Sequence, residues 1–271
     1  MHLTALIAQF PVSLAIQRNL ASLLAILEQA RPGELLLTPE GSLSGYCDDL
    51  TFLDGLQMDE LQDALAQLQQ AARQRQVFLW VGACLYEDQR WYNTACGFTP
   101  QGERLVYRKT NLATHERGVF TPGDELPVYR LSTPAGEFCL GVQLCRELKF
   151  PEQWGWLARQ GAQVILHLNN ATGSSHEQPV WRSHLVSRAA ENQRYVLSAN
   201  CAADQQKSPT LAVAPSGQVL CEIVSPGLEI ARQELDLSQV SNWYLDQSRQ
   251  DLVCLAERGD RRPRQPHLGH R

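Results

Sequence analysis

Residues 138–151 read FCLGVQLCRELKFP, and the interpretation of the whole chain starts from this stretch. The apolar run from Phe138 to Leu144 predicts a strand that leads directly into Cys145. Pro151 then begins a predicted helix, which is followed by a second apolar strand at 164–168. A reactive side chain at the end of a strand lies where α/β sheets form their ligand crevices.

Strands and helices continue to alternate on both sides of this stretch. Ser13 is expected to cap one amphipathic helix, and a second helix carries Met58, Leu61, Leu65, Leu68 and Ala72 on one face. A long helix is predicted at 177–194. Further strands are predicted at 2–10, 34–38, 77–85, 91–98, 104–107, 128–131, 195–199, 211–214, 218–222 and 228–234. This mixture, without a break in composition, predicts one layered α/β domain over residues 1–257.

Composition and charge exclude several classes of protein. The 271 residues are 44% hydrophobic and 20% charged, which is typical of a globular chain and not of a disordered or fibrous one. The net charge is −5, and residues 258–271 contain five Arg and one Asp, so the rest of the chain is acidic. We therefore expect no nucleic-acid partner and interpret 258–271 as a basic, flexible tail.

The sequence also carries expectations about location. No segment approaches the roughly 20 apolar residues that a membrane span requires, so we expect no membrane association. The first basic residue is Arg18, so the N-terminus lacks the cationic start of a secretory signal. Eight cysteines lie at irregular spacings without a CxxC pair. We expect a cytoplasmic protein with reduced thiols.

Several common catalytic motifs are missing. The sequence contains no GxGxxG, Walker loop, HExxH or CxxC, so dinucleotide, phosphate-loop and common zinc chemistries have no support. Residues 41–45 read GSLSG and nearly match the elbow of serine hydrolases, but Leu43 occupies the position of the nucleophile. A serine nucleophile is therefore not expected.

Three reactive side chains each follow a predicted strand. Glu40 comes after LLLTP, Lys109 after LVYR, and Cys145 after LGVQL. Each alone has an ordinary explanation, as a solvated carboxylate, a surface cation or a core thiol. As a set they suit acyl transfer. A thiol, whose free pKa is about 8.5, needs a base, and the developing oxyanion needs a fixed cation or donor.

The motifs around these residues resemble those of the nitrilase superfamily of carbon–nitrogen hydrolases, in its amidase-like branch. The resemblance rests on LTPEGSLSGY at 37–46, VYRKTNL at 106–112 and CRELKFPE at 145–152. Further similar segments are WYNTA at 91–95, ERGVFTPGD at 116–124, GAQVIL at 161–166 and RAAENQ at 188–193. Their order and spacing cover residues 3 to about 232, so chance is a poor explanation.

The resemblance implies a four-layer α-β-β-α sandwich that hydrolyses a non-peptide C–N bond in an amide, ω-amide or carbamoyl compound. It implies Cys145 as the nucleophile, Glu40 as the general base, and Lys109 as the oxyanion stabiliser, together with the backbone N–H of Arg146. A thioester would form, ammonia or an amine would leave, and water activated by Glu40 would release the acid. No metal or organic cofactor is implied.

The resemblance also suggests residues that bind substrate. Glu116 matches a region where members often carry a second acidic residue that orients the lysine and the substrate, although a loop ion pair with Arg117 is the alternative. Tyr46, Asn169 and Asn170 occupy positions that commonly form the wall of the substrate pocket. These four residues are therefore expected at the site.

Three positions depart from the family pattern. Asn111 replaces a common histidine, and Lys149 replaces an arginine. Arg146 stands where an aromatic residue is more usual and where nitrile-cleaving members tend to have Trp. An amide-type substrate is thus expected in preference to a nitrile. Arg146 either binds a substrate carboxylate or pairs with an acidic residue such as Glu147 or Glu152.

Two alternatives from other functional classes remain open at this point. In the first, Cys145 belongs to a papain-like hydrolase whose base is His167 or His184. In the second, the chain is a binding or scaffold protein that kept the fold and lost the chemistry.

The resemblance also implies an assembly. Members of the superfamily typically associate through helices that flank the cysteine motif. Trp154 and Trp156 lie in the helix that follows the motif, where two large exposed aromatic side chains would be unusual. We expect a homodimer, with packing of both rings inside one chain as the alternative.

Overall fold

The first strand, β1 (His2–Gln9), explains the layered architecture, because both of its faces are apolar. Ala5 and Ile7 point into one hydrophobic core, whereas Leu6 and Ala8 point into another. A strand that is apolar on both faces must be covered on both sides. The computed structural model describes residues 1–249 and places β1 in the middle of such a stack; the predicted tail at 258–271 lies outside the described residues.

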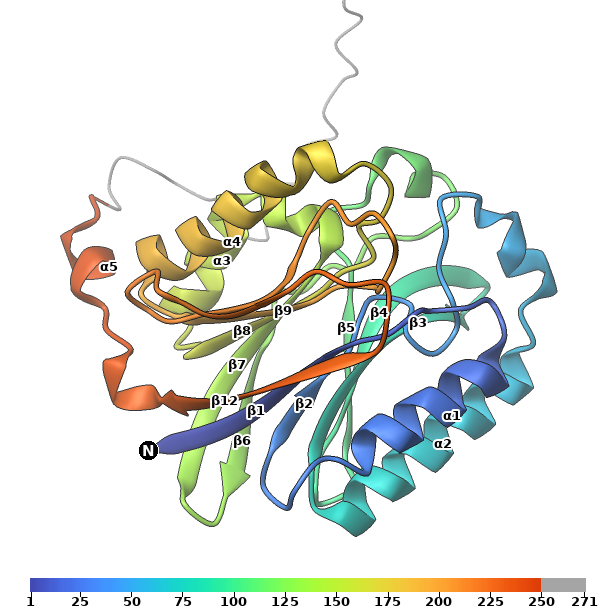
Figure 1. The fold of residues 1–271 in the computed structure, drawn as a ribbon, viewed down its shortest axis with the longest axis horizontal. Coiled ribbons are helices and arrows are strands. Elements are labelled where there is room, and N and C mark those ends of the chain that lie inside the picture. The colour runs from blue at the N-terminus through green and yellow to red at the C-terminus, as the bar shows by residue number, and fades with distance from the viewer. Residues whose placement is uncertain (250–271) are drawn as a thin grey trace, which may run out of the picture.

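The first sheet has the strand order β12-β1-β2-β3-β4-β5. Strands β1, β2, β3 and β5 run in one direction, and β4 and β12 run against them. Helices α1 (Ile16–Leu27) and α2 (Met58–Arg75) cover its outer face (Figure 1). The other strands are β2 (Leu35–Leu37), β3 (Phe78–Glu87), β4 (Arg90–Phe98), β5 (Arg104–Arg108) and β12 (Glu229–Asp236).

The second sheet has the order β11-β10-β9-β8-β7-β6, in which β7, β8 and β9 are parallel. Helices α3 (Pro151–Arg159) and α4 (Gln178–Asn192) cover its outer face. Its strands are β6 (Val128–Thr133), β7 (Gly136–Leu144), β8 (Val164–Leu168), β9 (Tyr195–Ala199), β10 (Thr210–Val213) and β11 (Val219–Ile223). A short helix, α5 (Trp243–Gln247), follows β12. Single-turn helices lie at 50–55, 114–116, 145–149, 175–177 and 237–239.

The two sheets pack face to face through a shared core. This core takes alternate residues from each sheet, such as Leu35 and Leu37 from β2 and Leu166 and Leu168 from β8. Phe78 and Phe138 meet edge to face across it, with ring centroids 5.4 Å apart. The molecule is therefore the four-layer α-β-β-α sandwich that the sequence motifs imply.

The predicted strands and the three predicted long helices are all present, with ends shifted by at most a few residues. The predicted cap of the first helix is wrong. The N-cap of α1 is Ala15, because the Ser13 hydroxyl instead accepts a hydrogen bond from the Ala15 N–H and contacts Asn19 Oδ1 at 3.1 Å. Ser13 thus closes the turn before the helix.

The candidate residues meet at one edge of the sandwich. Glu40 and Lys109 follow the parallel strands β2 and β5 of the first sheet, and Cys145 follows β7 of the second. A backbone hydrogen bond of 3.3 Å from the Glu40 N–H to the Asn169 carbonyl joins the two sheets there. Gly82 in β3 permits this arrangement, because a Cβ at that position would lie only 2.2 Å from the Gly41 nitrogen.

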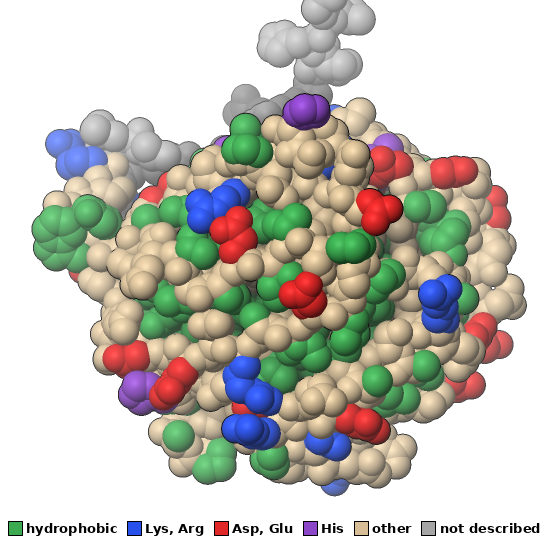
Figure 2. Space-filling view, in the orientation of Figure 1, with side chains coloured by type: hydrophobic (Ala, Val, Ile, Leu, Met, Phe, Trp, Pro, Cys, Tyr) green, Lys and Arg blue, Asp and Glu red, His purple; other side chains and the backbone are tan. Residues whose placement is uncertain are grey.

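The surface is mixed in character. On the face drawn in Figure 2, acidic and basic side chains are interspersed, and hydrophobic side chains run between them across the middle. No helix within residues 1–249 is long and apolar enough to cross a membrane.

Candidate active site

A cavity of about 250 Å³ opens at the edge where the strands end. Cys145 lies in its wall, next to residues from both halves of the chain. Of the predicted substrate-binding residues, Tyr46, Arg146 and Asn170 line the cavity. The other lining residues are Cys47, Asp48, Ala113, His115, Ala171, Thr172, Glu177, Trp181 and Lys207.

Lys109 is buried beside this cavity between two carboxylates. Its Nζ lies 2.9 Å from Glu40 Oε1 and 2.9 Å from Glu116 Oε1, and all three side chains are inaccessible to solvent. Glu116 therefore does not form the loop ion pair with Arg117 that the sequence left open. A buried charge needs this kind of pairing, because water no longer solvates it.

Two neutral side chains complete the cluster. Asn93 donates from Nδ2 to Glu40 and to Glu116, at 2.8 Å in each case. The Tyr46 hydroxyl donates to Glu116 at 2.7 Å and lies 2.9 Å from His115 Nε2. Because the hydroxyl proton faces Glu116, the tyrosine oxygen accepts from the histidine.

The cluster fixes the protonation of its members. Burial alone would lower the pKa of Lys109, but Glu40, Cys145 and Glu116 raise it overall, so the ammonium keeps its proton. Burial alone would raise the pKa of Glu116, but Lys109 and the donors around Glu116 lower it overall. Burial and the neighbouring carboxylates raise the pKa of Tyr46, which therefore stays a neutral phenol.

Cys145 has an unusual backbone. Its φ is +39°, a conformation that residues with a side chain rarely adopt, and it lies at the junction between β7 and a single helical turn. Burial first, and then the charge of Glu40, raise the pKa of its thiol, while Lys109 acts in the opposite direction. The resting group is a thiol, and its attack requires a base.

Side chains hold the turn that carries Cys145. The carboxylate of Glu147 accepts from the Leu144 N–H at 2.7 Å, from the Thr110 N–H at 2.8 Å and from the Asn111 N–H at 3.0 Å. The indole of Trp154 donates to the Glu147 carbonyl at 3.0 Å. Glu147 therefore ties the strand end that carries Cys145 to the loop that follows Lys109.

Three buried side chains at the site, those of Glu40, Asn93 and Asn169, have polar atoms without a hydrogen-bond partner. Glu40 Oε2 has none, although Oε1 of the same carboxylate accepts from both Lys109 and Asn93. The side-chain oxygen and nitrogen of Asn169 are also unpartnered. Asn169 is not among the residues that line the cavity, whereas Asn170 is. A buried carboxylate oxygen with a free lone pair can accept a proton.

Arg146 is exposed at the cavity and makes no ion pair within residues 1–249. The expected alternative pairing with Glu147 or Glu152 is therefore absent there. The Glu147 carboxylate instead accepts hydrogen bonds from the Tyr107 hydroxyl and from the backbone N–H groups of Thr110, Asn111 and Leu144.

The two histidines of the papain-like alternative do not serve the thiol. His167 Nε2 lies 3.0 Å from the Cys145 carbonyl oxygen and its Nδ1 lies 2.9 Å from Ser198 Oγ, so neither nitrogen is directed at sulfur. His184 is a half-buried residue of α4 and is not among the lining residues of the cavity. Among the charged groups, Glu40 has the largest effect on the pKa of the Cys145 thiol.

Several residues of the site are not among those predicted from the sequence. Asn93 was noted only within a motif, although a buried amide in the middle of an apolar strand signals a polar network. His115, Asp48, Glu177 and Lys207 come from four different loops, whose convergence on one cavity leaves no sequence pattern.

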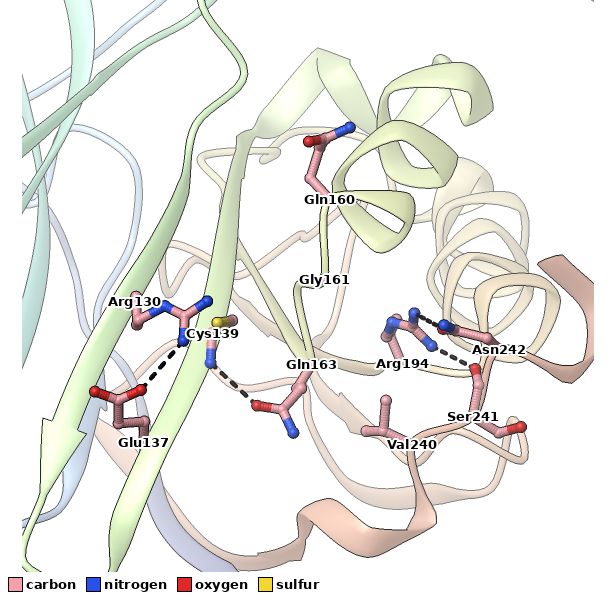
Figure 3. A pocket seen from close by; sticks show the side chains of 10 residues that line it. All are labelled: Arg130, Glu137, Cys139, Gln160, Gly161, Gln163, Arg194, Val240, Ser241 and Asn242. Carbon is pink, nitrogen blue, oxygen red and sulfur yellow. Dashed lines mark hydrogen bonds and ion pairs between the residues drawn. The ribbon is translucent and has the colours of Figure 1, made fainter. Parts of the chain in front are cut away.

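A second cavity lies at the opposite ends of β7, β8 and β9 and has a volume of about 560 Å³ (Figure 3). Its polar groups pair with one another. Arg130 pairs with Glu137 at 3.2 Å, the Cys139 N–H donates to Gln163, and Arg194 donates to Ser241 and Asn242. The free thiol of Cys139 also lies in this wall. No cluster of three or more His, Cys, Asp or Glu residues within residues 1–249 could hold a metal ion.

The buried ion cluster predicts a pH-dependent loss of stability in Glu116→Gln. At neutral pH the substitution should lower the free energy of unfolding by at least about 2 kcal/mol, because it weakens a buried, hydrogen-bonded ion pair. The pKa of Glu116 is depressed below its ordinary value of 4.5 in the folded protein. Its contribution is therefore complete above that value and is lost as the pH falls through the lower folded pKa.

The measurement is denaturant unfolding of the wild type and the variant between pH 3 and pH 7, roughly the range in which carboxylates titrate. The difference in stability should shrink below a pH of about 4.5. Glu137→Gln is the matched control, because it removes a carboxylate from an exposed pair and should change stability by less than about 1 kcal/mol. A difference that stays constant, or grows, as the pH falls would contradict the assignment.

Comparison with known proteins identifies the family of the chain. The family model for carbon–nitrogen hydrolases matches residues 3–244. An (R)-stereoselective amidase from Pseudomonas sp. is 33% identical over 247 residues, which cover 86% of this chain and 82% of the amidase. An ω-amidase from Xenopus laevis is 29% identical and is matched over 71% of this chain and 72% of its own length.

Among solved structures, an amidase from Nesterenkonia sp. AN1, crystallised as a cysteine-to-alanine variant with butyramide, superposes with a TM-score of 0.75. It is 27% identical, and the match covers 93% of this chain and 95% of that one. Since the family model spans nearly all of the described residues and the relatives align along most of their length, the chain belongs to the carbon–nitrogen hydrolase family, the nitrilase superfamily.

Proposed function

We propose that this protein is an amidase that works through a cysteine thioester, with Glu40, Lys109 and Cys145 as its catalytic residues. One observation carries the proposal. The Cys145 thiol lies in the wall of a cavity, within the electrostatic influence of a buried carboxylate, Glu40, and a buried ammonium, Lys109. A nucleophile, a base and an oxyanion stabiliser are the three groups that acyl transfer requires.

In the acylation half-reaction, Glu40 takes the thiol proton as the Cys145 sulfur attacks the amide carbon. The C=O π electrons move to oxygen, and Lys109 and the Arg146 N–H stabilise the oxyanion. The tetrahedral intermediate then collapses. The C–N bond breaks, the nitrogen leaves as ammonia or an amine with the proton from Glu40, and a thioester remains on Cys145.

In the second half-reaction, Glu40 removes a proton from water as the water attacks the thioester carbon. Collapse of the second tetrahedral intermediate breaks the C–S bond and returns the proton to the thiolate. The products are a carboxylic acid and the free Cys145 thiol. Each step uses only groups of this chain and water, so no metal or organic cofactor takes part.

Glu116 supports the chemistry indirectly. Its carboxylate holds the Lys109 ammonium and the Asn93 amide, both of which also bind Glu40. Glu116 therefore holds the side chains of the base and of the oxyanion stabiliser in fixed positions relative to each other. Tyr46 and Asn170 shape the wall of the cavity, and Asn169 binds the Glu40 loop through its carbonyl.

We infer that the acyl part of the substrate carries a carboxylate, and that Arg146 binds it. Arg146 directly follows the nucleophile, is exposed in the cavity wall and has no acidic partner within residues 1–249. A guanidinium can bind a carboxylate through two parallel hydrogen bonds. Dicarboxylic monoamides, which are ω-amides, fit this arrangement. The related ω-amidase is consistent with this class, whereas the butyramide complex favours neutral amides.

The protein is further proposed to be a homodimer. Trp154 is fully buried within its own chain and does not support the interface expected from sequence. Trp156 in α3 is 40% exposed, and Trp243 and Tyr244 in α5 are 60% and 53% exposed. These aromatic side chains belong to helices on the same side of the second sheet, where Figure 2 shows hydrophobic atoms over α5. Exposed aromatic groups of this size are typical of interfaces.

The catalytic proposal predicts that Cys145→Ala abolishes amide hydrolysis and leaves the fold intact. The side chain is small and half-buried, so its loss should change the melting temperature little, whereas the covalent intermediate can no longer form. The measurement is ammonia release from a panel of amides, ω-amides and carbamoyl compounds, with mass detection of the acyl adduct in the wild type.

Cys139→Ala is the matched control, because Cys139 lies at the other end of the same strand. It should retain wild-type turnover. Wild-type rates in Cys145→Ala would refute the covalent mechanism. A wild type that hydrolyses none of the compounds and forms no adduct would favour the alternative of a catalytically silent binding protein.

The substrate proposal predicts a change of preference in Arg146→Gln. The ratio of kcat/KM for succinamate to that for butyramide should fall by roughly tenfold to a hundredfold, the loss of a charge-assisted contact of about 1.5–3 kcal/mol. The two substrates have the same chain length and differ only in the terminal group. Arg146→Lys, which keeps the charge, should lose less. If wild type and Arg146→Gln gave the same ratio, Arg146 would not bind the carboxylate.

The assembly proposal predicts that Trp156→Glu converts a dimer into a monomer. A buried carboxylate at an interface is strongly unfavourable, so the mass measured by light scattering should fall by about half at micromolar concentration. Tyr86→Glu is the control, because Tyr86 is similarly exposed, at 44%, but lies on β3 of the other sheet. A wild type that is monomeric at every concentration would contradict the homodimer proposal.

The cytoplasmic location stays a prediction that cell fractionation can test.

A further inference from the structure

His167 is a buried residue of β8 whose two ring nitrogens both have partners. Nε2 lies 3.0 Å from the carbonyl oxygen of Cys145, and Nδ1 lies 2.9 Å from the hydroxyl of Ser198. His167 and Ser198 are paired across the parallel strands β8 and β9, so their side chains lie side by side on one face. The chain of contacts thus runs from β9 through β8 to the nucleophile.

The chemistry of these groups sets the direction of each hydrogen bond. A carbonyl oxygen can only accept a hydrogen bond. Nε2 of His167 therefore carries the proton and donates a hydrogen bond to the carbonyl oxygen of Cys145. Nδ1 then accepts from the Ser198 hydroxyl. Burial lowers the pKa of His167 to about 4, so the ring is neutral at physiological pH and acts as a donor, not as an acid.

The hydrogen bond to Cys145 also fixes the next peptide group. No peptide bond in residues 1–249 is cis, so the carbonyl of Cys145 and the N–H of Arg146 point in opposite directions. An oxygen held against His167 directs the Arg146 N–H away from the His167 ring, and both Cys145 and Arg146 line the cavity. A donor on the carbonyl oxygen also polarises the peptide and strengthens its N–H as a donor.

The positive φ of Cys145 adds a reason for such a restraint. A non-glycine residue with a φ of +39° is strained, so it keeps this conformation only where its surroundings hold it. The Leu144 N–H is held by Glu147 on one side of this residue. His167 holds the carbonyl on the other side.

We propose that His167, oriented by Ser198, is a positioning residue that aims and polarises the Arg146 N–H for the oxyanion. This inference rests on the proposed function, because an oxyanion forms only if Cys145 attacks an amide carbon. It differs from the papain-like alternative, in which a histidine would take the proton of the thiol.

The experiment compares His167→Leu, His167→Gln and Ser198→Ala with the wild type in two reactions. The first is steady-state hydrolysis of the best amide substrate. The second is the reaction of the Cys145 thiol with dipyridyl disulfide, followed by mass spectrometry of the Cys145 peptide. Both reactions need a well-placed thiol, but the disulfide has no carbonyl group and forms no oxyanion.

We expect His167→Leu to lower kcat by at least about tenfold, since loss of a true oxyanion donor costs about 10²–10³. KM and the disulfide rate should change by less than about threefold. His167→Gln keeps a side-chain N–H of similar reach and should recover most of kcat. Ser198→Ala, which removes only the group that orients the ring, should lose about threefold to tenfold.

Three results would overturn the inference. The first is an unchanged kcat in His167→Leu. The second is a parallel fall of hydrolysis and of the disulfide rate, which would mean that the thiol itself had moved. The third applies if His167→Leu does not fold, and is a wild-type kcat in Ser198→Ala. Absence of any amide turnover in the wild type would refute the proposed function first, and this inference with it.

Discussion

The buried ammonium of Lys109 is the constraint on which the rest of the site depends. A charge without access to water is tolerated only where ionic partners and hydrogen bonds replace its hydration. Glu40 and Glu116 supply them, and they reach Lys109 from separate loops. Because Glu40 follows β2 and Lys109 follows β5, the cluster can form only when strands β2 to β5 of the first sheet are in place. Assembly of the active site is therefore coupled to folding of that sheet.

The cluster contains two carboxylates for one ammonium, and this imbalance bears on the thiol. Cys145 comes from the other sheet, so it meets the finished cluster only when the two sheets pack. Burial and the excess of negative charge raise the pKa of Cys145, so the thiol is not an exposed, reactive thiolate at rest. In the proposed mechanism, proton transfer to Glu40 accompanies attack on the substrate, which links reactivity to the presence of a bound amide.

The fold and the three catalytic candidates could be predicted because they leave local patterns. The apolar run 138–144 and the helical spacing of Leu61, Leu65 and Leu68 are set by burial, and the reactive residues directly follow such runs. The cavity wall could not be predicted in the same way. His115, Glu177 and Lys207 come from loops whose mutual distances depend on how two sheets pack, and His167 looks from sequence like a base for the thiol. Only the structure shows that His167 instead contacts a carbonyl oxygen.

The distribution of charge along the cavity orients the proposed substrate. The buried cluster beside the cavity is negative, because Glu40 and Glu116 together exceed Lys109 by one charge, and the neutral donors Tyr46 and Asn93 offset this only in part. In the wall, Lys207 lies 3.7 Å from Glu177, whereas Arg146 has no acidic partner within residues 1–249. A carboxylate that entered first would meet two carboxylates in a region of low dielectric constant, which is strongly unfavourable. A neutral amide can enter first and leave its carboxylate beside Arg146, and this order brings the scissile carbon to Cys145.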